Sequence, residues 1–281
     1  MRAAVLQSTS GIDPAANAAM LTKAIGQAKA GGADMLFTPE MVGCLDRDRE
    51  RAAGALTDEA HDSVLAAVRD AAARHGLWVH IGSLGLAGER EDGRWTNRGF
   101  VIDANGDIRA RYDKIHLFDV DLPGGTSWRE SAAYGPGEQA VTVDTPWVRL
   151  GLSVCYDLRF ADLYRRLSDE GAHILLVPAA FTVPTGRAHW EILLRARAIE
   201  AAAFVIAPAQ TGRHEDGRET YGHSLVIDPW GDVILDMGEA PGLAFADLDL
   251  GRISEVRARI PVIDHRRAIK GGEPPDSFQS D

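Results

Sequence analysis

The chain has 281 residues, 45% of them hydrophobic and 25% charged, which is the balance of a globular protein with a sizeable core. Thirty Lys and Arg against 41 Asp and Glu give a net charge of −11, which disfavours general binding to nucleic acid or to an anionic membrane. No apolar run approaches the roughly 20 residues needed to span a bilayer. Residues 1–7 lack the pattern of a secretory signal, and two cysteines, Cys44 and Cys155, do not make a disulfide framework. We therefore expect a cytoplasmic protein with reduced thiols.

Strand-like and helix-like segments alternate along the first half of the chain. Asp13 and Pro14 predict the start of a helix that runs to residue 30. Thr57 is the expected cap of a second helix, which ends at Gly76. An Asn-Gly pair at 105–106 predicts a β-hairpin. The expected strands of this half cover residues 3–7, 34–38, 77–84, 98–103 and 108–112.

The second half shows the same order of elements. Helices are expected at 160–170 and 189–203, and strands at 148–154, 173–177, 204–209, 221–228 and 233–236. Between the halves lies a long polar segment with four Gly and two Pro between positions 123 and 137, and loops of this length tend to be functional. Two similar halves without a linker predict one α/β domain over residues 1–281, with helices covering mixed sheets and a polar C-terminal tail from about residue 268.

Cys155 follows the apolar strand 148–154 and comes directly before an expected helix start. A side chain at such a corner lies at the mouth of the sheet, where the helix N-terminus favours a thiolate and offers N–H groups to an oxyanion. A buried core cysteine is the alternative, since cysteine is among the most buried residue types. Position alone gives the two interpretations equal weight.

Three charged residues lie at comparable places. Glu40 follows the strand 34–38, where burial would suit a general base with a raised pKa; a solvated loop acid is the commoner case for any single Glu. Lys114 closes the second strand of the first hairpin, and it either stabilises developing negative charge or is a surface lysine. Glu130 lies in the long polar segment, where contact with solvent is the alternative.

Cofactor motifs are absent from the sequence. It has no P-loop and no G-x-G-x-x-G, its nine histidines lack zinc-like spacing, and it has no cysteine pair for a metal site. Residues 151–155 approach G-x-S-x-G, but Ser153 falls within the strand rather than at an elbow. We expect neither a metal nor an organic cofactor.

Taken together, these segments resemble the nitrilase (carbon–nitrogen hydrolase) superfamily over roughly residues 3–267. Three motifs in the order of the family carry the resemblance: Phe-Thr-Pro-Glu at 37–40, Tyr-Asp-Lys-Ile-His-Leu-Phe-Asp at 112–119 and Gly-Leu-Ser-Val-Cys-Tyr-Asp-Leu-Arg-Phe at 151–160. Three motifs in order are far more specific than any one of them. Further similar pieces lie at 185–190, 195–200, 222–224 and 228–231.

The resemblance implies a four-layer α-β-β-α sandwich and a Glu–Lys–Cys triad, here Glu40, Lys114 and Cys155. A second family glutamate follows the Lys motif; Glu130 matches it and would orient Lys114 or the substrate. Glu40 would take the thiol proton while Cys155 attacks an amide carbonyl. Lys114 and the backbone N–H of Tyr156 would stabilise the oxyanion. A thioester would form and be hydrolysed to the acid, with release of ammonia.

Members of the superfamily usually pair helix to helix, which implies a homodimer or higher homo-oligomer. The expected helix 189–203 mixes charges into a nearly all-round apolar pattern, which fits burial with ion pairs or a subunit interface equally well. We expect the helix after Cys155 at the same interface.

Residues 210–215 and 221–224 are most similar to the deaminated glutathione amidase branch, and other motifs are shared with omega-amidases. Arg187 stands where both branches usually have proline, and residues 41–49 are unusually charged. The implied substrates are carboxylates, so a local cation must overcome the net charge. Guanidinium groups suit carboxylates, and the candidates are Arg159, Arg187 and Arg213. An ion pair with Asp157 or with an acid at the interface is the alternative for Arg159, and Arg213 is favoured because it lies in the loop that separates the branches.

Three hypotheses follow. The first is an amidase acting on a small carboxylated ω-amide, similar to deaminated glutathione or α-ketoglutaramate. The second is another activity on the same fold: N-carbamoyl hydrolysis, nitrile hydrolysis or N-acyl transfer. The third is a non-catalytic binding protein on this fold, and the presence of all four expected site residues argues against it.

Overall fold

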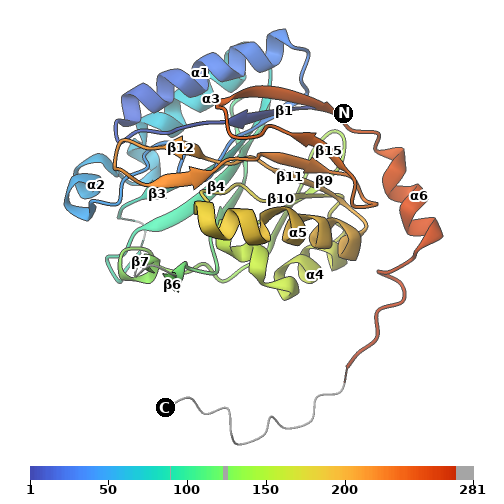
Figure 1. Ribbon diagram of the computed structural model, residues 1–281. Helices are drawn as coiled ribbons and strands as arrows, with labels where there is room; N and C mark the ends of the chain where they lie inside the picture. Colours follow the sequence, from blue (N-terminus) through green and yellow to red (C-terminus); the bar gives the residue numbers. More distant parts are fainter. Residues whose placement is uncertain (89, 123–125, 270–281) are drawn as a thin grey trace, which may run out of the picture.

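Two six-stranded sheets form the centre of the computed structural model, which describes residues 1–88, 90–122 and 126–269 (Figure 1). The first sheet, in the order β16-β1-β2-β3-β4-β5, contains β1 (Arg2–Gln7), β2 (Met35–Phe37), β3 (Trp78–Leu86), β4 (Thr96–Ile102), β5 (Ile108–Asp113) and β16 (Gly242–Asp247). The second, in the order β15-β14-β11-β10-β9-β8, contains β8 (Val141–Asp144), β9 (Arg149–Leu152), β10 (Ile174–Leu176), β11 (Phe204–Ala207), β14 (Leu225–Ile227) and β15 (Val233–Asp236). Most of the expected polar tail, residues 270–281, lies outside the described residues.

The two sheets have the same plan. In each, three parallel strands are flanked on one side by an antiparallel hairpin and on the other by a single antiparallel strand. In the first sheet β1, β2 and β3 are parallel and β4–β5 is the hairpin; in the second β9, β10 and β11 are parallel and β14–β15 is the hairpin. The two similar halves expected from the order of the elements are therefore confirmed.

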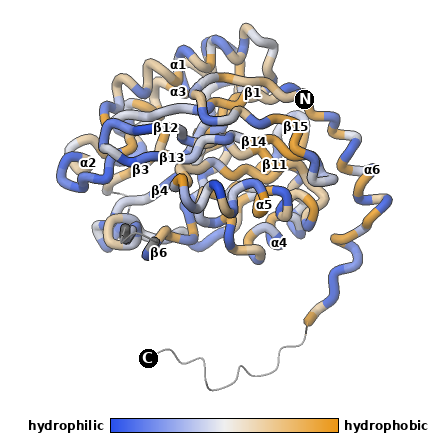
Figure 2. The backbone as a smooth tube through the Cα atoms, viewed as in Figure 1, coloured by the Kyte–Doolittle hydropathy of each residue, from blue (hydrophilic) through white to orange (hydrophobic). Residues whose placement is uncertain are grey.

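Helices cover the outer face of each sheet, which completes the expected α-β-β-α sandwich (Figure 1). Helices α1 (Pro14–Ala30) and α3 (Ser63–His75) lie over the first sheet, and α4 (Ala161–Asp169) and α5 (Val183–Ala201) lie over the second. Side chains of β1 alternate between two clusters: Ala4 and Leu6 pack with the α1–α3 layer, and Ala3 and Val5 pack toward the second sheet. Figure 2 shows the hydrophobic colour concentrated on central strands such as β11. Within the described ranges, no helix is both long and apolar enough to cross a membrane.

Helix starts agree with the sequence in part. Asp13 caps α1 as expected, through a hydrogen bond from the N–H of Ala15. The expected cap Thr57 is wrong: α3 begins at Ser63 and Asp62 caps it, while the Thr57 carbonyl accepts from Ala87 next to the end of β3. The preceding residues instead form α2 (Arg49–Ala55) and a turn, η1 (Glu59–His61). Two further elements, α6 (Gly251–Arg259) and β16, were not expected; β16 pairs with β1 and completes the first sheet.

Gly82 lets β3 approach the segment that leads into Glu40. A Cβ at position 82 would overlap the carbonyl oxygens of Thr38 and Pro39, which are backbone atoms that cannot move aside cheaply. The Gly82 N–H also donates to Thr38 Oγ1 at 3.1 Å. The close contact between the backbone of β3 at Gly82 and the backbone at 38–39 therefore fixes the path of the chain after β2.

We predict that Gly82→Ala destabilises the fold by about 1–3 kcal/mol through overpacking and lowers activity, because it displaces the segment before Glu40. Gly54→Ala is the matched control, since nothing lies within 4 Å of a Cβ at that position in α2; it should stabilise by roughly 0.5–1 kcal/mol through helix propensity. Urea unfolding of both variants checks this. A Gly82→Ala protein as stable as the wild type would contradict the close approach.

Candidate active site

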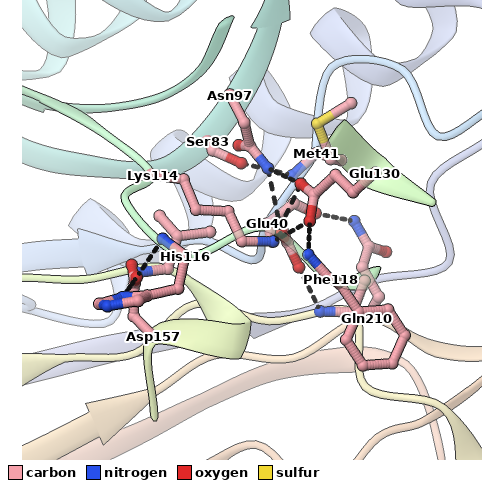
Figure 3. A network of polar contacts seen from close by, with 12 residues as sticks. Glu40, Met41, Ser83, Asn97, Lys114, His116, Phe118, Glu130, Asp157 and Gln210 are labelled. Carbon is pink, nitrogen blue, oxygen red and sulfur yellow. Dashed lines mark hydrogen bonds and ion pairs between the residues drawn. The ribbon is translucent and has the colours of Figure 1, made fainter. Parts of the chain in front are cut away.

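The four candidate residues predicted from the sequence meet between the two sheets, each supplied by a segment that follows a strand. Glu40 comes three residues after β2, Lys114 directly after β5 and Cys155 three residues after β9. Glu130 begins the turn η2 (Glu130–Ala132), which follows a small hairpin of β6 (Asp119–Leu122) and β7 (Thr126–Arg129). Strands of both halves thus bring the four side chains to one place, and Figure 3 shows three of them, Glu40, Lys114 and Glu130, facing one another.

Lys114 is the centre of this network. Its Nζ donates to Glu40 Oε1 at 3.0 Å and to Glu130 Oε1 and Oε2 at 3.0 and 2.8 Å. The side chain is 2% exposed. Burial alone would lower the pKa of Lys114, but the charges of Glu130 and Glu40 raise it well above its usual value. The group is therefore an ammonium ion across the whole neutral range.

Asn97, at the start of β4, belongs to the network and was not predicted. Its Nδ2 donates to Glu40 Oε1 at 3.1 Å and to Glu130 Oε1 at 3.3 Å, and its main-chain carbonyl accepts from the main-chain N–H of Lys114 at 2.9 Å. One amide thus spaces both carboxylates around the ammonium. The sequence signal was slight: a polar residue one position before the strand expected at 98–103.

Hydrogen bonds to the main chain around Glu40 and to its side chain hold its carboxylate in place. Gln210 donates to the Glu40 carbonyl at 3.0 Å, and the Met41 N–H donates to Ser83 Oγ at 2.9 Å. The Ala180 N–H donates to Glu40 Oε2 at 2.9 Å. Met41 adopts the left-handed conformation, with φ 52°, so the chain turns sharply just after the glutamate. These contacts orient both oxygens before any substrate arrives.

Ionisation of Glu40 differs from the expectation. Burial raises its pKa, but the Lys114 ammonium and hydrogen bonds from Cys155, Lys114 and Asn97 outweigh burial and leave the pKa below its usual value. The expected raised pKa considered burial without the lysine. Glu40 is consequently a carboxylate, and the Cys155 thiol lies beside it.

Cys155 lies at a sharp turn of the chain, and its φ of 52° is one that residues other than Gly rarely adopt. Its N–H donates to the Pro178 carbonyl at 2.9 Å. Burial and the neighbouring Glu40 raise the pKa of the thiol well above its usual value, and Lys114 lowers it only in part. The thiol therefore keeps its proton, and the thiolate that a helix N-terminus would favour does not form. The element that follows is a short turn, η3 (Cys155–Arg159), rather than a long helix, and burial outweighs its dipole.

Asp157 holds this corner in place. Its carboxylate is fully buried and accepts from Tyr112 Oη at 2.7 Å, from the Val154 N–H at 2.9 Å, and from His116 N and Nδ1 at 3.0 and 2.7 Å. His116 lies two residues after Lys114, so the same carboxylate ties the lysine segment to the cysteine corner. The Tyr156 N–H between Cys155 and Asp157 has no acceptor among the described residues, and it is free to meet an oxyanion.

A cavity of about 400 Å³ opens onto these groups. Its walls are rich in aromatic rings: Trp95, Phe118, Trp128, Tyr134, Tyr156 and Phe181. Its arginines are Arg47, Arg49, Arg129 and Arg218. In the part of the chain that the structure describes, no group of three or more His, Cys, Asp or Glu side chains is arranged to hold a metal ion.

None of the three arginines expected to bind substrate lines this cavity. Arg187 and Arg213 are exposed. The Arg159 guanidinium lies over the rings of Tyr156 and Phe181, at 5.8 and 5.7 Å from their centroids. It therefore packs behind two side chains of the wall. The charged segment at 41–49, noted as unusual in the sequence, supplies Arg47 and Arg49 instead.

We predict that Asp157→Ala costs at least about 3 kcal/mol, since four donors lose their acceptor and each buried donor left unpaired costs roughly 1–3 kcal/mol. Tyr112→Phe removes one donor and should cost about 1 kcal/mol. Denaturant unfolding of the two variants measures both losses. Equal losses would mean that Asp157 does not hold the corner.

Comparison with known proteins agrees with this geometry. The carbon–nitrogen hydrolase family model matches residues 2–258. A deaminated glutathione amidase of Synechocystis sp. is 41% identical over 94% of this chain and 97% of its own length. The solved structure of the Caenorhabditis elegans NitFhit protein is 38% identical, with a TM-score of 0.87 over 95% of this chain and 65% of that one.

The structure of an amidase from Nesterenkonia sp. AN1 is 28% identical, with a TM-score of 0.77 over 93% of this chain and 98% of that one. It is a Glu→Gln variant and shows the result of Michael addition of acrylamide at the active-site cysteine. The family model covers most of the chain, and the relatives match it nearly from end to end. The chain therefore belongs to the carbon–nitrogen hydrolase family of the nitrilase superfamily.

Proposed function

We propose that this enzyme is a cysteine amidase that hydrolyses a small carboxylated amide through a thioester on Cys155. The observation that carries the proposal is the contact of a buried thiol with a carboxylate whose other partner is a buried ammonium. In this arrangement Cys155 is the nucleophile, Glu40 the general base and Lys114 an oxyanion donor. All three side chains belong to one chain.

The first half-reaction makes the thioester. Glu40 accepts the thiol proton as the sulfur of Cys155 attacks the amide carbonyl carbon. Negative charge then develops on the carbonyl oxygen, where the Lys114 ammonium and the Tyr156 N–H stabilise it. Glu40 returns the proton to the amide nitrogen, the carbon–nitrogen bond breaks, and the amine or ammonia leaves.

The second half-reaction restores the enzyme. Glu40 takes a proton from water while the water oxygen attacks the thioester carbon. The carbon–sulfur bond breaks, the acid leaves, and Glu40 gives the proton to the Cys155 sulfur. Glu130 binds Lys114 with both oxygens and also accepts from the Phe118 N–H at 2.7 Å. It therefore positions the lysine, while Glu40 alone carries the proton.

The names of the relatives bear on the substrate. Deaminated glutathione contains substituted amides, so an amidase acting on it releases an amine, whereas a primary ω-amide releases ammonia. We include both leaving groups in the proposal. N-carbamoyl and nitrile substrates are the alternatives on this fold, and the acid and nitrogen products separate them.

We predict that Cys155→Ala abolishes turnover with little loss of stability. Glu40→Gln and Lys114→Ala should each lower kcat by at least about 100-fold, the usual cost of one catalytic group. Cys44→Ala is the matched control: Cys44 is buried, and burial raises its pKa to about 11, so activity should be unchanged. Mass spectrometry of the acid formed from a panel of primary and substituted amides measures this. A near-normal kcat in Glu40→Gln or Lys114→Ala would remove that residue from the mechanism, and an essential Cys44 would reverse the assignment of the nucleophile.

The protonation states give a second prediction. Glu40 raises the pKa of Cys155 by its charge and as a hydrogen-bond acceptor, and Lys114 opposes it. Replacing Glu40 with Gln removes the negative charge that raises the pKa of Cys155 and leaves the Lys114 charge that lowers it. The thiolate absorbance near 240 nm, read against Cys155→Ala, should appear only in alkaline solution in the wild type and at lower pH in Glu40→Gln. A wild-type thiolate at neutral pH would contradict the geometry of the pair.

We also propose a homodimer that packs through α4 and α5. Ile192 and Ile199 lie seven residues apart on one face of α5, and they are 70% and 48% exposed. Exposed apolar side chains that share one face commonly mark a surface where subunits associate. Sedimentation of the wild type should give twice the mass of one chain, and Ile192→Glu with Ile199→Glu should shift it toward one. A wild-type monomer would overturn the proposal.

A further inference from the structure

The rim of the cavity is built from three segments. Residues 41–49 and the start of α2 form one side, the hairpin β6–β7 forms another, and a hairpin of β12 (Thr211–Arg213) and β13 (Glu219–Tyr221) forms the third. Arg49 Nη2 donates to the Arg129 carbonyl at 2.9 Å and joins the first two sides. The rim is thus a connected structure around the entrance.

Charges on the cavity wall do not cancel. Five cationic and four carboxylate side chains line it, although the whole chain carries −11. Most of the cations are already paired: Lys114 with Glu40 and Glu130, Arg218 with Asp216, and Arg129 with Asp121. The lining carboxylate of Asp46 is likewise held by Arg51. Excess positive charge therefore belongs to the remaining two arginines, Arg47 and Arg49.

The alternation of Asp46, Arg47, Asp48 and Arg49 explains why these two are available. Asp46 holds Arg51 through two hydrogen bonds of 2.6 and 2.7 Å. Asp48 caps α2 by accepting from the N–H groups of Glu50 and Arg51. Both acids are therefore used within their own segment, and neither neutralises the arginine beside it.

The two guanidinium groups are exposed on the rim. Arg47 has no carboxylate partner among the described residues, and only its backbone N–H is engaged, by Asp216 Oδ2 at 2.8 Å. Arg49 gives one N–H to a carbonyl, which leaves its charge uncompensated. Glu219 puts one carboxylate on the opposite side of the rim. Arg213 lies directly opposite Glu219 in the β12–β13 hairpin, and this cross-strand cation offsets the negative charge of Glu219.

We propose that Arg47 and Arg49 bind a carboxylate at the end of the substrate that is remote from the amide, and so determine substrate specificity. This rests on the proposed amidase function. Cys155 and Lys114 are buried at the inner end of the cavity, whereas the two arginines lie at its open end. A substrate that reaches both is an extended amide. The volume of about 400 Å³ suits such a molecule, and paired guanidinium groups suit its carboxylate.

Two synthetic amides test the proposal: glutaryl-alanylglycine and its C-terminal carboxamide, which differ only by one remote charge. The double variant Arg47→Ala with Arg49→Ala should raise KM for the carboxylate at least about tenfold with kcat nearly unchanged. KM for the carboxamide should stay within about twofold, and the double Lys variant should restore part of the preference. Arg187→Ala, which removes an exposed arginine outside the cavity wall, is the matched control and should leave both KM values unchanged.

Direct binding separates this proposal from the amidase function. Calorimetry on Cys155→Ala, which cannot turn over, should show tighter binding of the carboxylate than of the carboxamide, and the preference should vanish when Arg47 and Arg49 are also Ala. Equal binding of the two amides, or a preference that survives loss of both arginines, overturns the carboxylate site even if the wild type hydrolyses both compounds. A wild type that binds the carboxylate selectively but hydrolyses no amide overturns the amidase function instead.

Discussion

The burial of Lys114 between two carboxylates is the constraint on which the site depends. An ammonium ion taken out of water is costly unless opposite charges and hydrogen bonds surround it. Glu40 and Glu130 supply the charge, and Asn97 spaces them. The same ammonium keeps Glu40 ionised in a place where burial alone would protonate it. In the proposed mechanism, a structural requirement of the lysine is what makes the glutamate a base.

Glu40 in turn raises the pKa of the Cys155 thiol. Beside a fixed carboxylate the buried thiol of Cys155 keeps its proton. In the proposed mechanism the proton moves to Glu40 only when the sulfur begins to bond to a carbonyl carbon, whose oxygen brings new negative charge toward Lys114. The charge of the site is rearranged rather than created during the reaction, and preorganised groups of this kind need little reorganisation.

Much of the fold could be predicted because its signals are local. The Asn-Gly turn, the cap at Asp13 and the apolar strands each depend on a few adjacent residues. Thr57 failed as a cap because Asp62 competes for the same role nearby. The candidate triad came from ordered motifs, whereas Asn97 and Asp157 act through partners far away in the sequence, which no local pattern reveals. The pKa direction of Glu40 was mistaken for the same reason, since it depends on a lysine that another strand brings in, and the sequence left open the state of Cys155, which depends in turn on Glu40.

The arginines show the limit of reasoning from motifs. Arg213 lies in a segment that separates related branches, yet the cavity is lined by Arg47 and Arg49 from the segment after Glu40. The charged residues of a sequence do not show which acids already have a partner. Here Asp46 is paired with Arg51, and Asp48 accepts hydrogen bonds at the start of α2. Only the three-dimensional arrangement shows which charges remain available.

Transfer of the acyl group to Cys155 is tested most directly by rapid acid quenching of the enzyme during turnover of an amide, followed by peptide mass spectrometry. The peptide that contains Cys155 should carry the mass of the acyl portion of the substrate, added as a thioester that hydroxylamine removes. Product formation in which this peptide stays unmodified at every quench time, with hydroxylamine yielding no hydroxamate, would contradict nucleophilic attack by Cys155.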